Sequence, residues 1–570
     1  MSGSLGLHDT NGVPLILRDH HNSHPRPPLL GRTAARISRT LLPLCCTLAV
    51  LCLLPSSPLL AESTAPSPPE SSLLSRNQTA ELERQIARGM REWNVPGIAI
   101  AIVKDDQIVY SRGFGVRSLE TREPVDANTI FAIGSPTKSV TATALAMLVD
   151  DGRMSWDTPV KDYVPEFETY DPYVTSQLSS RDIACHRTGI EHANFLHFGP
   201  LDRSKLAEHP TREGIVRAFK HLRPSEPFRT QFAYKNEPWV VAGAVVDSVA
   251  GMSWDAFLRE RIFNPLGMTR SSTSVRQTDS QTNVSSVHVF SDGQLTPMPA
   301  FIVDVAGAMG SINSTVVDLA QYVRFHLGDG TFGGKRLLSK ASLEELHTPH
   351  MTLKDDFIGG TPFSNVASYS LGWMVQDYRG DTLIHHAGHP PGGGANVFMI
   401  PEKGLGVVLL ANAEAMSLLG AIALQALDSL LDAPSYDWQA RLLTFNPQRL
   451  KSYESPAYKA MLAEREKTRD ADAKPTLPLS AYAGIYHNSA YGNIRISHSD
   501  GKLKAQLWTH TGDLTHWEHN TFFFAWDPKA YFIHAIVEGH PFVHFEIDER
   551  GRPSTMNFTS LGSFVRQEFP

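Results

Sequence analysis

One short segment, Ser135-Pro136-Thr137-Lys138, constrains this 570-residue chain more than any other feature. Pro136 suits the first turn of a helix, where its missing N–H costs little, and apolar residues recur at helical spacing from Val140 to Leu148. Asp150-Asp151-Gly152 then ends the run. Lys138 lies one turn after Ser135 on the same helix face, so the sequence predicts a hydroxyl and an amine side by side at a helix N-terminus.

This arrangement is typical of a serine nucleophile and its base. A serine hydroxyl is a poor nucleophile at neutral pH unless a base takes its proton and preorganised donors hold the oxyanion. The Ser135 N–H lacks an intrahelical partner at a helix start, so it is a candidate oxyanion donor. Lys138 works as a base only where burial and neighbouring donors lower its pKa. Ser-x-x-Lys alone arises about twice by chance in a chain this long, usually as a solvated helix turn.

A second segment, Tyr234-Lys235-Asn236, follows in the order expected of a serine acyl-transfer site. Tyr234 and Asn236 are two residues apart, so in an extended segment they point to one side. They offer a phenol for proton transfer and an amide for orienting a substrate. The alternative interpretation is an aromatic residue and a turn asparagine before a helix.

The third segment is predicted to lie in an antiparallel meander. Residues 382–386 form a strand pattern, and a glycine-rich turn leads to two further strands at 396–400 and 407–410. A period of two puts His386 and Gly388 on one face, where the missing Cβ of Gly388 would let a substrate backbone approach. The N–H of His389 would complete the oxyanion hole. A lone strand histidine is more often structural, but the order of the three segments favours a functional one.

These segments together resemble the serine β-lactamase and penicillin-binding D,D-peptidase superfamily, in particular the class C β-lactamase-related branch that includes esterases and D-aminopeptidases. The resemblance covers roughly residues 79–432. Further matching segments are Phe131 to Gly134, Ala184 to Gly189, Gly243 to Trp254 and Ala306 to Ser311.

The resemblance implies an α/β (α+β) fold, in which an antiparallel sheet packs with helices and residues 135 to about 327 form a helical subdomain. It implies Ser135 as nucleophile, Lys138 and Tyr234 as the proton-transfer pair, Asn236 as a substrate-binding amide and His386 in the third motif. No metal and no cofactor are expected.

The third motif departs from the class C β-lactamase pattern. Those enzymes carry Lys-Thr-Gly, where the lysine helps to hold the drug's carboxylate, whereas this chain has His386-Ala387-Gly388. A neutral imidazole anchors a carboxylate more weakly. The histidine variant is common among the esterase and peptidase members, and Lys235 is a candidate source of the lost charge.

The sequence therefore predicts a serine hydrolase that forms an acyl-enzyme on Ser135 and acts on a small ester or a D-amino-acid peptide. One alternative is a true β-lactamase or D,D-carboxypeptidase that takes β-lactams. Another is a catalytically silent binding or scaffold protein of the same fold. Intact Ser135, Lys138, Tyr234 and Asn236 weigh against that last alternative.

The N-terminal region is typical of an export signal. Three arginines precede an apolar run from Leu41 to Leu54, and a cleavage-like region ends at Ala61. Residues 1–61 are predicted to be a signal peptide and 62–78 a linker, which gives a periplasmic or secreted protein, or a membrane-anchored one if the signal stays uncleaved. The apolar run is too short for a stable membrane span. Three of the four cysteines fall in the signal, so only Cys185 remains, most simply as a buried helix residue.

A second domain is predicted after the hydrolase domain at 79–432. Residues 433–475 are interpreted as a linker because of their prolines and the charged stretch 464–470. Residues 476–570 alternate polar and apolar residues between Gly/Asp turns, which indicates a small antiparallel barrel. This region resembles the lipocalin-like domain often fused to this hydrolase branch. Its aromatic residues are expected to fill the barrel core rather than a ligand cage.

Composition excludes other classes. The formal charge of the chain is −7, and residues 1–61 hold five Arg and two acids, so their removal gives −7 − 3 = −10. An acidic chain binds nucleic acid poorly. The glycines at 328–333 match a dinucleotide fingerprint but follow a helical pattern, and the C-terminal histidines lack ligand spacing with supporting acids. The expected partner is a small-molecule substrate, and the sequence does not specify an oligomeric state.

Overall fold

The computed structural model describes residues 74–567, except 194–195, 197–208, 292–293, 299, 301–302, 355–361, 444–455, 527–541 and 560. The predicted signal peptide lies outside the described residues, as does most of the predicted linker at 62–78.

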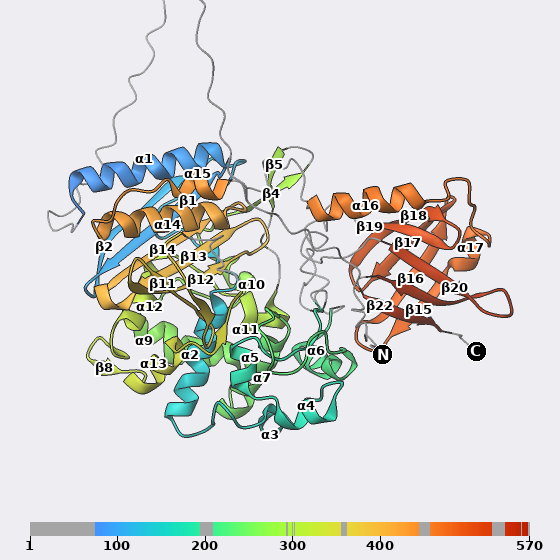
Figure 1. Cartoon of the computed structure of the whole chain (residues 1–570), viewed down its shortest axis with the longest axis horizontal. Coiled ribbons are helices and arrows are strands. Elements are labelled where there is room, and N and C mark those ends of the chain that lie inside the picture. Colours follow the sequence, from blue (N-terminus) through green and yellow to red (C-terminus); the bar gives the residue numbers. More distant parts are fainter. Residues whose placement is uncertain are drawn as a thin grey trace, which may run out of the picture. The chain divides into compact units, whose positions relative to one another are not determined.

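An eight-stranded antiparallel sheet forms the centre of the N-terminal domain (Figure 1). Its strands, in spatial order, are β2 (Gln107–Gly115), β1 (Gly97–Lys104), β14 (Leu405–Ala411), β13 (Gly394–Ile400), β12 (Asp381–Gly388), β11 (Met374–Tyr378), β10 (Ala367–Tyr369) and β9 (Met351–Thr352). Strands β1 and β2 form a hairpin, with Asp105 and Asp106 in the left-handed conformation at its turn. The predicted meander is β12–β13–β14.

Helices cover both faces of this sheet, which explains why β1 is apolar on both sides. Ile98, Ile100 and Ile102 pack in a cluster with α1 (Arg76–Glu92) and α14 (Met416–Leu430). The alternate residues of β1, from Ala99 to Val103, join a second cluster with α2 (Thr137–Asp150) and α12 (Val316–Leu327). Figure 1 shows α1 and α14 on one side of the sheet and α2 and α12 on the other.

The segment between β2 and α12 is mainly helical, as the resemblance implied. The nucleophile helix α2 runs through its middle, and residues 137–148 are all buried. The other α-helices among the described residues of this segment are α3 (Val160–Tyr163), α4 (Pro172–Gln177), α5 (Ser180–Ala184), α6 (Arg212–Ala218), α7 (Pro238–Ala250), α8 (Trp254–Leu258), α9 (Asn264–Leu266), α10 (Val275–Thr278) and α11 (Gly307–Gly310). Its short strand pairs are β3 (Phe131–Ala132) with β6 (Asn313–Ser314) and β4 (Val287–Ser291) with β5 (Gln294–Met298).

The region interpreted as an interdomain linker contains two helices among its described residues. Before this region, the chain forms the strand pair β7 (Thr331–Phe332) and β8 (Lys335–Arg336), then α13 (Lys340–His347), the later strands of the sheet and α14. The two helices that follow α14 are α15 (Trp438–Leu442) and α16 (Pro456–Thr468). Trp438 is fully buried, and its indole N–H donates to Asp428 Oδ2 at 2.9 Å. The packing of the hydrolase domain therefore continues past residue 432, and part of the charged stretch lies in the last turns of α16.

The C-terminal domain is a closed antiparallel barrel of eight strands, preceded by α17 (Leu479–Tyr482). The strands are β15 (Gly484–Asn488), β16 (Gly492–Ser499), β17 (Lys502–Leu507), β18 (His510–Glu518), β19 (Thr521–Trp526), β20 (Phe542–Ile547), β21 (Pro553–Phe558) and β22 (Gly562–Arg566). Phe545 is fully buried, with its ring centroid 5.1 Å from that of Tyr482 and 5.7 Å from that of Phe522. The aromatic residues therefore form the barrel core, as predicted.

No single helix among the described residues is long and apolar enough to cross a membrane. The segments Pro238–Ala250 and Trp254–Leu266 reach that length and apolar composition only when taken together, and a 76° bend separates them. Cys185 is a free, buried thiol at the C-terminal end of α5.

Candidate active site

A sharp turn before α2 presents the predicted nucleophile. Gly134 lies between β3 and Ser135 with φ of 61°, which a residue with a Cβ rarely adopts. A Cβ there would also lie 3.0 Å from Pro390, so the turn is packed against the glycine-rich loop that follows β12. The glycine is therefore needed both for the backbone conformation and for the close approach of the two segments.

Lys138 is buried beside Ser135, as the spacing predicted. Its Nζ lies 3.2 Å from Ser135 Oγ, 2.9 Å from Asn236 Oδ1 and 2.9 Å from the Met309 carbonyl oxygen. Burial lowers the pKa of Lys138 to about 7, although the charge of Glu237 acts in the opposite direction. A neutral amine can donate to Asn236 and Met309 and keep its lone pair for the Ser135 proton.

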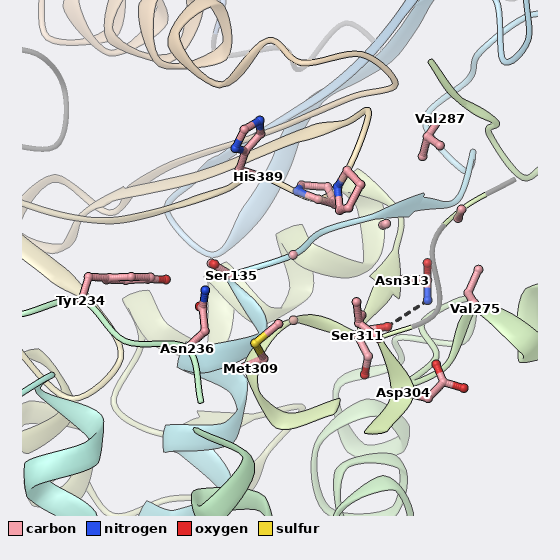
Figure 2. Close-up of a pocket in the computed structure, with 17 residues that line it drawn as sticks. Ser135, Tyr234, Asn236, Val275, Val287, Asp304, Met309, Ser311, Asn313 and His389 are labelled. Carbon is pink, nitrogen blue, oxygen red and sulfur yellow. Dashed lines mark hydrogen bonds between the residues drawn. The ribbon is translucent and has the colours of Figure 1, made fainter. Parts of the chain in front are cut away.

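Tyr234 lies on the other side of the nucleophile, in the loop before α7. The Nζ of Lys138 is 5.1 Å from the Tyr234 ring centroid. Burial raises the pKa of Tyr234, while a hydrogen bond with Ser135 lowers it. Figure 2 shows the Tyr234 hydroxyl and the Asn236 amide both directed toward Ser135. In the resting site Tyr234 is thus a neutral phenol that can pass a proton to or from Ser135.

His186 positions the tyrosine, a role that sequence reasoning did not assign although the segment Ala184 to Gly189 was recognised. The rings of His186 and Tyr234 are stacked, with centroids 4.2 Å apart and an interplanar angle of 24°. The Lys235 backbone N–H donates to His186 Nδ1 at 3.0 Å. His186 is 1% exposed, and burial holds its pKa well below the usual range, so the ring is neutral.

His386 does not line the cavity, contrary to its predicted substrate-binding role. Its Nδ1 donates to the Ala387 carbonyl at 2.8 Å, and the Tyr369 hydroxyl donates to its Nε2 at 2.9 Å. The side chain is fully buried, and burial together with the charge of Lys138 lowers its pKa to about 3. His386 is thus a neutral structural group behind the site.

Gly388 also has a different role from the predicted one. A Cβ on this residue would lie 2.0 Å from the Ile133 carbonyl oxygen and 2.6 Å from Pro136 Cδ. The space above Gly388 is therefore filled by the nucleophile turn, and the glycine lets β12 approach that turn rather than a substrate.

Lys235 does not replace the charge of the missing third-motif lysine. Its side chain is 4% exposed and donates to Ser225 Oγ at 3.0 Å and to Glu226 Oε1 at 3.3 Å. It is therefore held on the far side of the Tyr-Lys-Asn segment, in an ion pair of its own.

A cavity of about 200 Å³ opens on Ser135 and contains four of the seven predicted residues (Figure 2). These are Ser135, Tyr234, Asn236 and His389, whereas Lys138 lies behind Ser135. Part of the wall comes from the recognised segment at 306–311. The rest of the lining is largely apolar and includes Val275, Val287, Val303, Asp304, Asn313, Pro390 and Pro391.

The sheet lies between two helical layers, and a serine, a buried lysine and a tyrosine lie within hydrogen-bonding reach of one another beside β12, an arrangement typical of a serine hydrolase. The chain belongs to the Beta-lactamase family, whose sequence model matches residues 82–428. A second model, described only as a domain of unknown function, matches residues 468–569 and thus the barrel.

Proteins of similar sequence or structure have names that are consistent with this family. The unguisins hydrolase of Aspergillus violaceofuscus is 29% identical over 455 residues, covering 75% of this chain and 78% of that protein. Penicillin-binding protein 4 of Amycolatopsis lactamdurans is 29% identical over 326 residues, covering 56% of this chain and 82% of the relative. The structure of the penicillin-binding protein homologue from Pyrococcus abyssi has the same fold, with a TM-score of 0.55 at 22% identity, over 86% of this chain and all of that one.

Proposed function

We propose that this enzyme hydrolyses a small ester or a D-amino-acid peptide through an acyl-enzyme on Ser135. The contacts of Lys138 are the main support for this proposal. Its Nζ lies 3.2 Å from Ser135 Oγ, and Asn236 Oδ1 and the Met309 carbonyl accept its N–H groups. With a pKa near 7, a substantial fraction of the lysine is neutral at physiological pH and able to accept a proton.

The reaction follows from these positions. Ser135 Oγ attacks the carbonyl carbon while its proton passes to Lys138, with Tyr234 in the same hydrogen-bonded group. The backbone N–H groups of Ser135 and His389 are proposed to hold the oxyanion. The bond to the leaving alcohol or amine breaks, and that group takes a proton through Tyr234 and Lys138. Water then attacks the ester carbonyl and loses a proton to the same pair. The bond between the acyl carbon and Ser135 Oγ breaks, Ser135 takes up that proton, and the acid is released.

The shape of the cavity supports a small substrate. Its volume of about 200 Å³ and largely apolar lining suit a compact acyl group. A β-lactam drug carries a carboxylate, and the third-motif histidine that would meet it is neutral and turned to Tyr369. A true β-lactamase or D,D-carboxypeptidase is thus the second candidate. The similarity of the chain to a penicillin-binding protein supports it. A protein without catalytic activity would not need a buried Lys138 in contact with Ser135.

Intact-mass spectrometry with an activated-serine probe, such as a fluorophosphonate, tests the nucleophile. We expect one adduct on the wild-type protein, mapping to Ser135, and none on Ser135→Ala. A folded wild-type protein that takes no adduct would favour the scaffold. Initial rates on p-nitrophenyl esters, D-alanyl peptides and nitrocefin then separate the esterase, peptidase and β-lactamase candidates.

We also propose that the protein is exported by the signal at residues 1–61. The support is the order of arginines, apolar run and small-residue cleavage region in the sequence. N-terminal sequencing of the protein recovered outside the cytoplasm tests this, because cleavage is expected after Ala61. Recovery of the uncleaved chain with membranes would indicate an anchor instead.

A further inference from the structure

His389 and Glu414 form a pair at the edge of the cavity. His389 follows β12 directly and lines the cavity, and Glu414 lies between β14 and α14. His389 Nε2 is 3.5 Å from Glu414 Oε1. The imidazole side chain is 46% exposed, whereas the carboxylate side chain is 6% exposed. The acid is thus fixed in the protein and the base is accessible, so a ligand meets the imidazole rather than the carboxylate.

His389 is the source of positive charge in this cavity. Among the described residues that line it there is no lysine or arginine. Lys138 lies behind Ser135, Lys235 is paired with Glu226, and His386 is neutral. At the far edge, Asp304 is paired with Arg276 at 2.8 Å. In Figure 2, His389 and Asp304 lie on opposite sides of the cavity.

The surroundings favour the charged form of His389. Partial removal from water disfavours the imidazolium, but the hydrogen bond and the negative charge of Glu414 outweigh this effect and raise the pKa of His389. The other titratable groups nearby are engaged elsewhere: His386 with Tyr369, and His288 of β4 with the Asn412 carbonyl. Tyr234, across Ser135, is a neutral phenol. Glu414 is therefore the group that sets the charge of His389.

We propose that the imidazolium of His389, held by Glu414, recognises a carboxylate on the substrate close to the scissile bond. The inference rests on the proposed acyl-enzyme function of Ser135 and names the chemistry of its substrate. A charge-assisted hydrogen bond to an anion is among the stronger polar contacts. A carboxylate in this largely apolar cavity needs such a partner, because leaving a charge unpaired away from water is costly.

A dependence on pH follows. His389 is charged below its raised pKa and loses its proton as the pH rises through that value. The preference for a carboxylate over a neutral group of the same size is therefore largest at low pH and declines as the pH rises. The hydrolysis of a neutral substrate follows the titration of Lys138 instead, so the ratio of the two rates isolates His389.

Two matched pairs of esters test this, one on each side of the scissile bond. Mono-p-nitrophenyl succinate and p-nitrophenyl butyrate differ in a carboxylate on the acyl side, and 4-acetoxybenzoate and its methyl ester differ on the leaving-group side. The readout is the ratio of kcat/KM within each pair from about pH 5.5 to about pH 9, where the probe carboxylates are ionised. We expect at least about a tenfold preference for the anion in one pair at the lowest pH, declining at high pH.

Three variants assign the effect to the pair. His389→Asn removes the charge and should abolish the preference at every pH, and any general loss of activity cancels in the ratio. His389→Lys keeps a charge throughout the range, so the preference should persist at high pH. Glu414→Gln should move the decline to lower pH. His498→Asn changes an exposed histidine in β16 and should leave the ratio as in the wild type.

The outcomes separate this inference from the proposed function. Turnover that depends on Ser135, with the same ratio in wild type and His389→Asn for both pairs, would overturn the inference alone. No turnover of any of the four esters would overturn the inference and the proposed function together.

Discussion

At the scale of single residues, the site depends on where protons reside before the reaction starts. Lys138 and Tyr234 share Ser135, and burial shifts their pKa values in opposite directions, lowering that of the lysine and raising that of the tyrosine. Both groups therefore tend to be neutral in the resting enzyme. The types and order of these residues could be predicted from the sequence, whereas their protonation depends on burial and on the Met309 carbonyl, which no spacing rule reveals.

Removing the Tyr234 hydroxyl should slow the reaction without removing the nucleophile. We expect Tyr234→Phe to lower kcat/KM on the best ester by about 10²- to 10⁴-fold, since proton transfer by a positioned group contributes that much. Ser135 should still take a fluorophosphonate slowly, because Lys138 remains. Tyr173→Phe, at a side chain that is 65% exposed, is the control. Unchanged kinetics in Tyr234→Phe would remove the phenol from the mechanism.

Gly388 is a residue at which a small change should have a large effect on the site. In Gly388→Ala the added Cβ would lie 2.0 Å from the Ile133 carbonyl oxygen, so the nucleophile turn or β12 must move. We expect a loss of about 1–3 kcal/mol in the free energy of unfolding, as for other overpacked sites, together with slower acylation. Thermal unfolding measures the first and intact mass the second.

Gly214→Ala is the matched glycine control, because Gly214 lies within α6 and its nearest neighbour to an added Cβ is at 3.5 Å. It should leave stability unchanged or raise it, since alanine favours a helix over glycine. Equal effects of the two substitutions would contradict the role given to Gly388.

At the scale of elements, the predicted helix and meander are present because their periodicity is strong, but periodicity does not say which face of a strand remains open. His386 and Gly388 share a face of β12 as predicted. That face is closed by Tyr369 of β10 and by the turn around Ile133, which come from distant parts of the chain. The strand was therefore predicted correctly, whereas the surroundings of His386 and Gly388 differ from the predicted ones.

The loop that carries Tyr234 and Asn236 should depend on His186 for its conformation. His186→Phe keeps a ring for stacking but loses the acceptor for the Lys235 N–H, and His186→Asn keeps an acceptor but loses the stack. We expect each to lower kcat by roughly tenfold with a smaller change in KM, because a misplaced catalytic group affects the transition state more than binding. A purely structural role would instead lower thermal stability and leave the kcat of the folded protein unchanged.

At the scale of the whole molecule, two separate family matches correspond to a catalytic domain and a barrel. The existence of the barrel could be predicted from alternating residues and turns, since each strand carries its own signal. The packing of Trp438 beyond residue 432 could not, because one tryptophan in a proline-rich segment gives no pattern.

The barrel should be stabilised by its filled aromatic interior. We expect Phe545→Ala to lower the free energy of unfolding of the barrel by about 3–5 kcal/mol, the usual cost of removing a buried phenylalanine. Val565→Ala, at a side chain that is 57% exposed, should change it little. Calorimetry on the full chain measures both. An unchanged unfolding profile for Phe545→Ala would mean that the interior is not packed as described.

The central claim is that neutral Lys138 takes the proton of Ser135, and the pH dependence of acylation tests it most directly. The rate at which a neutral activated ester or fluorophosphonate modifies Ser135 can be followed by intact mass across the pH range in which the protein stays folded. Since Lys138 is a base only after losing its proton, we expect the rate to rise with pH through an apparent pKa of about 7 and to be lost in Lys138→Met. A rate that does not change with pH, or that falls as pH rises through 7, would contradict the assignment, as would undiminished acylation of Lys138→Met.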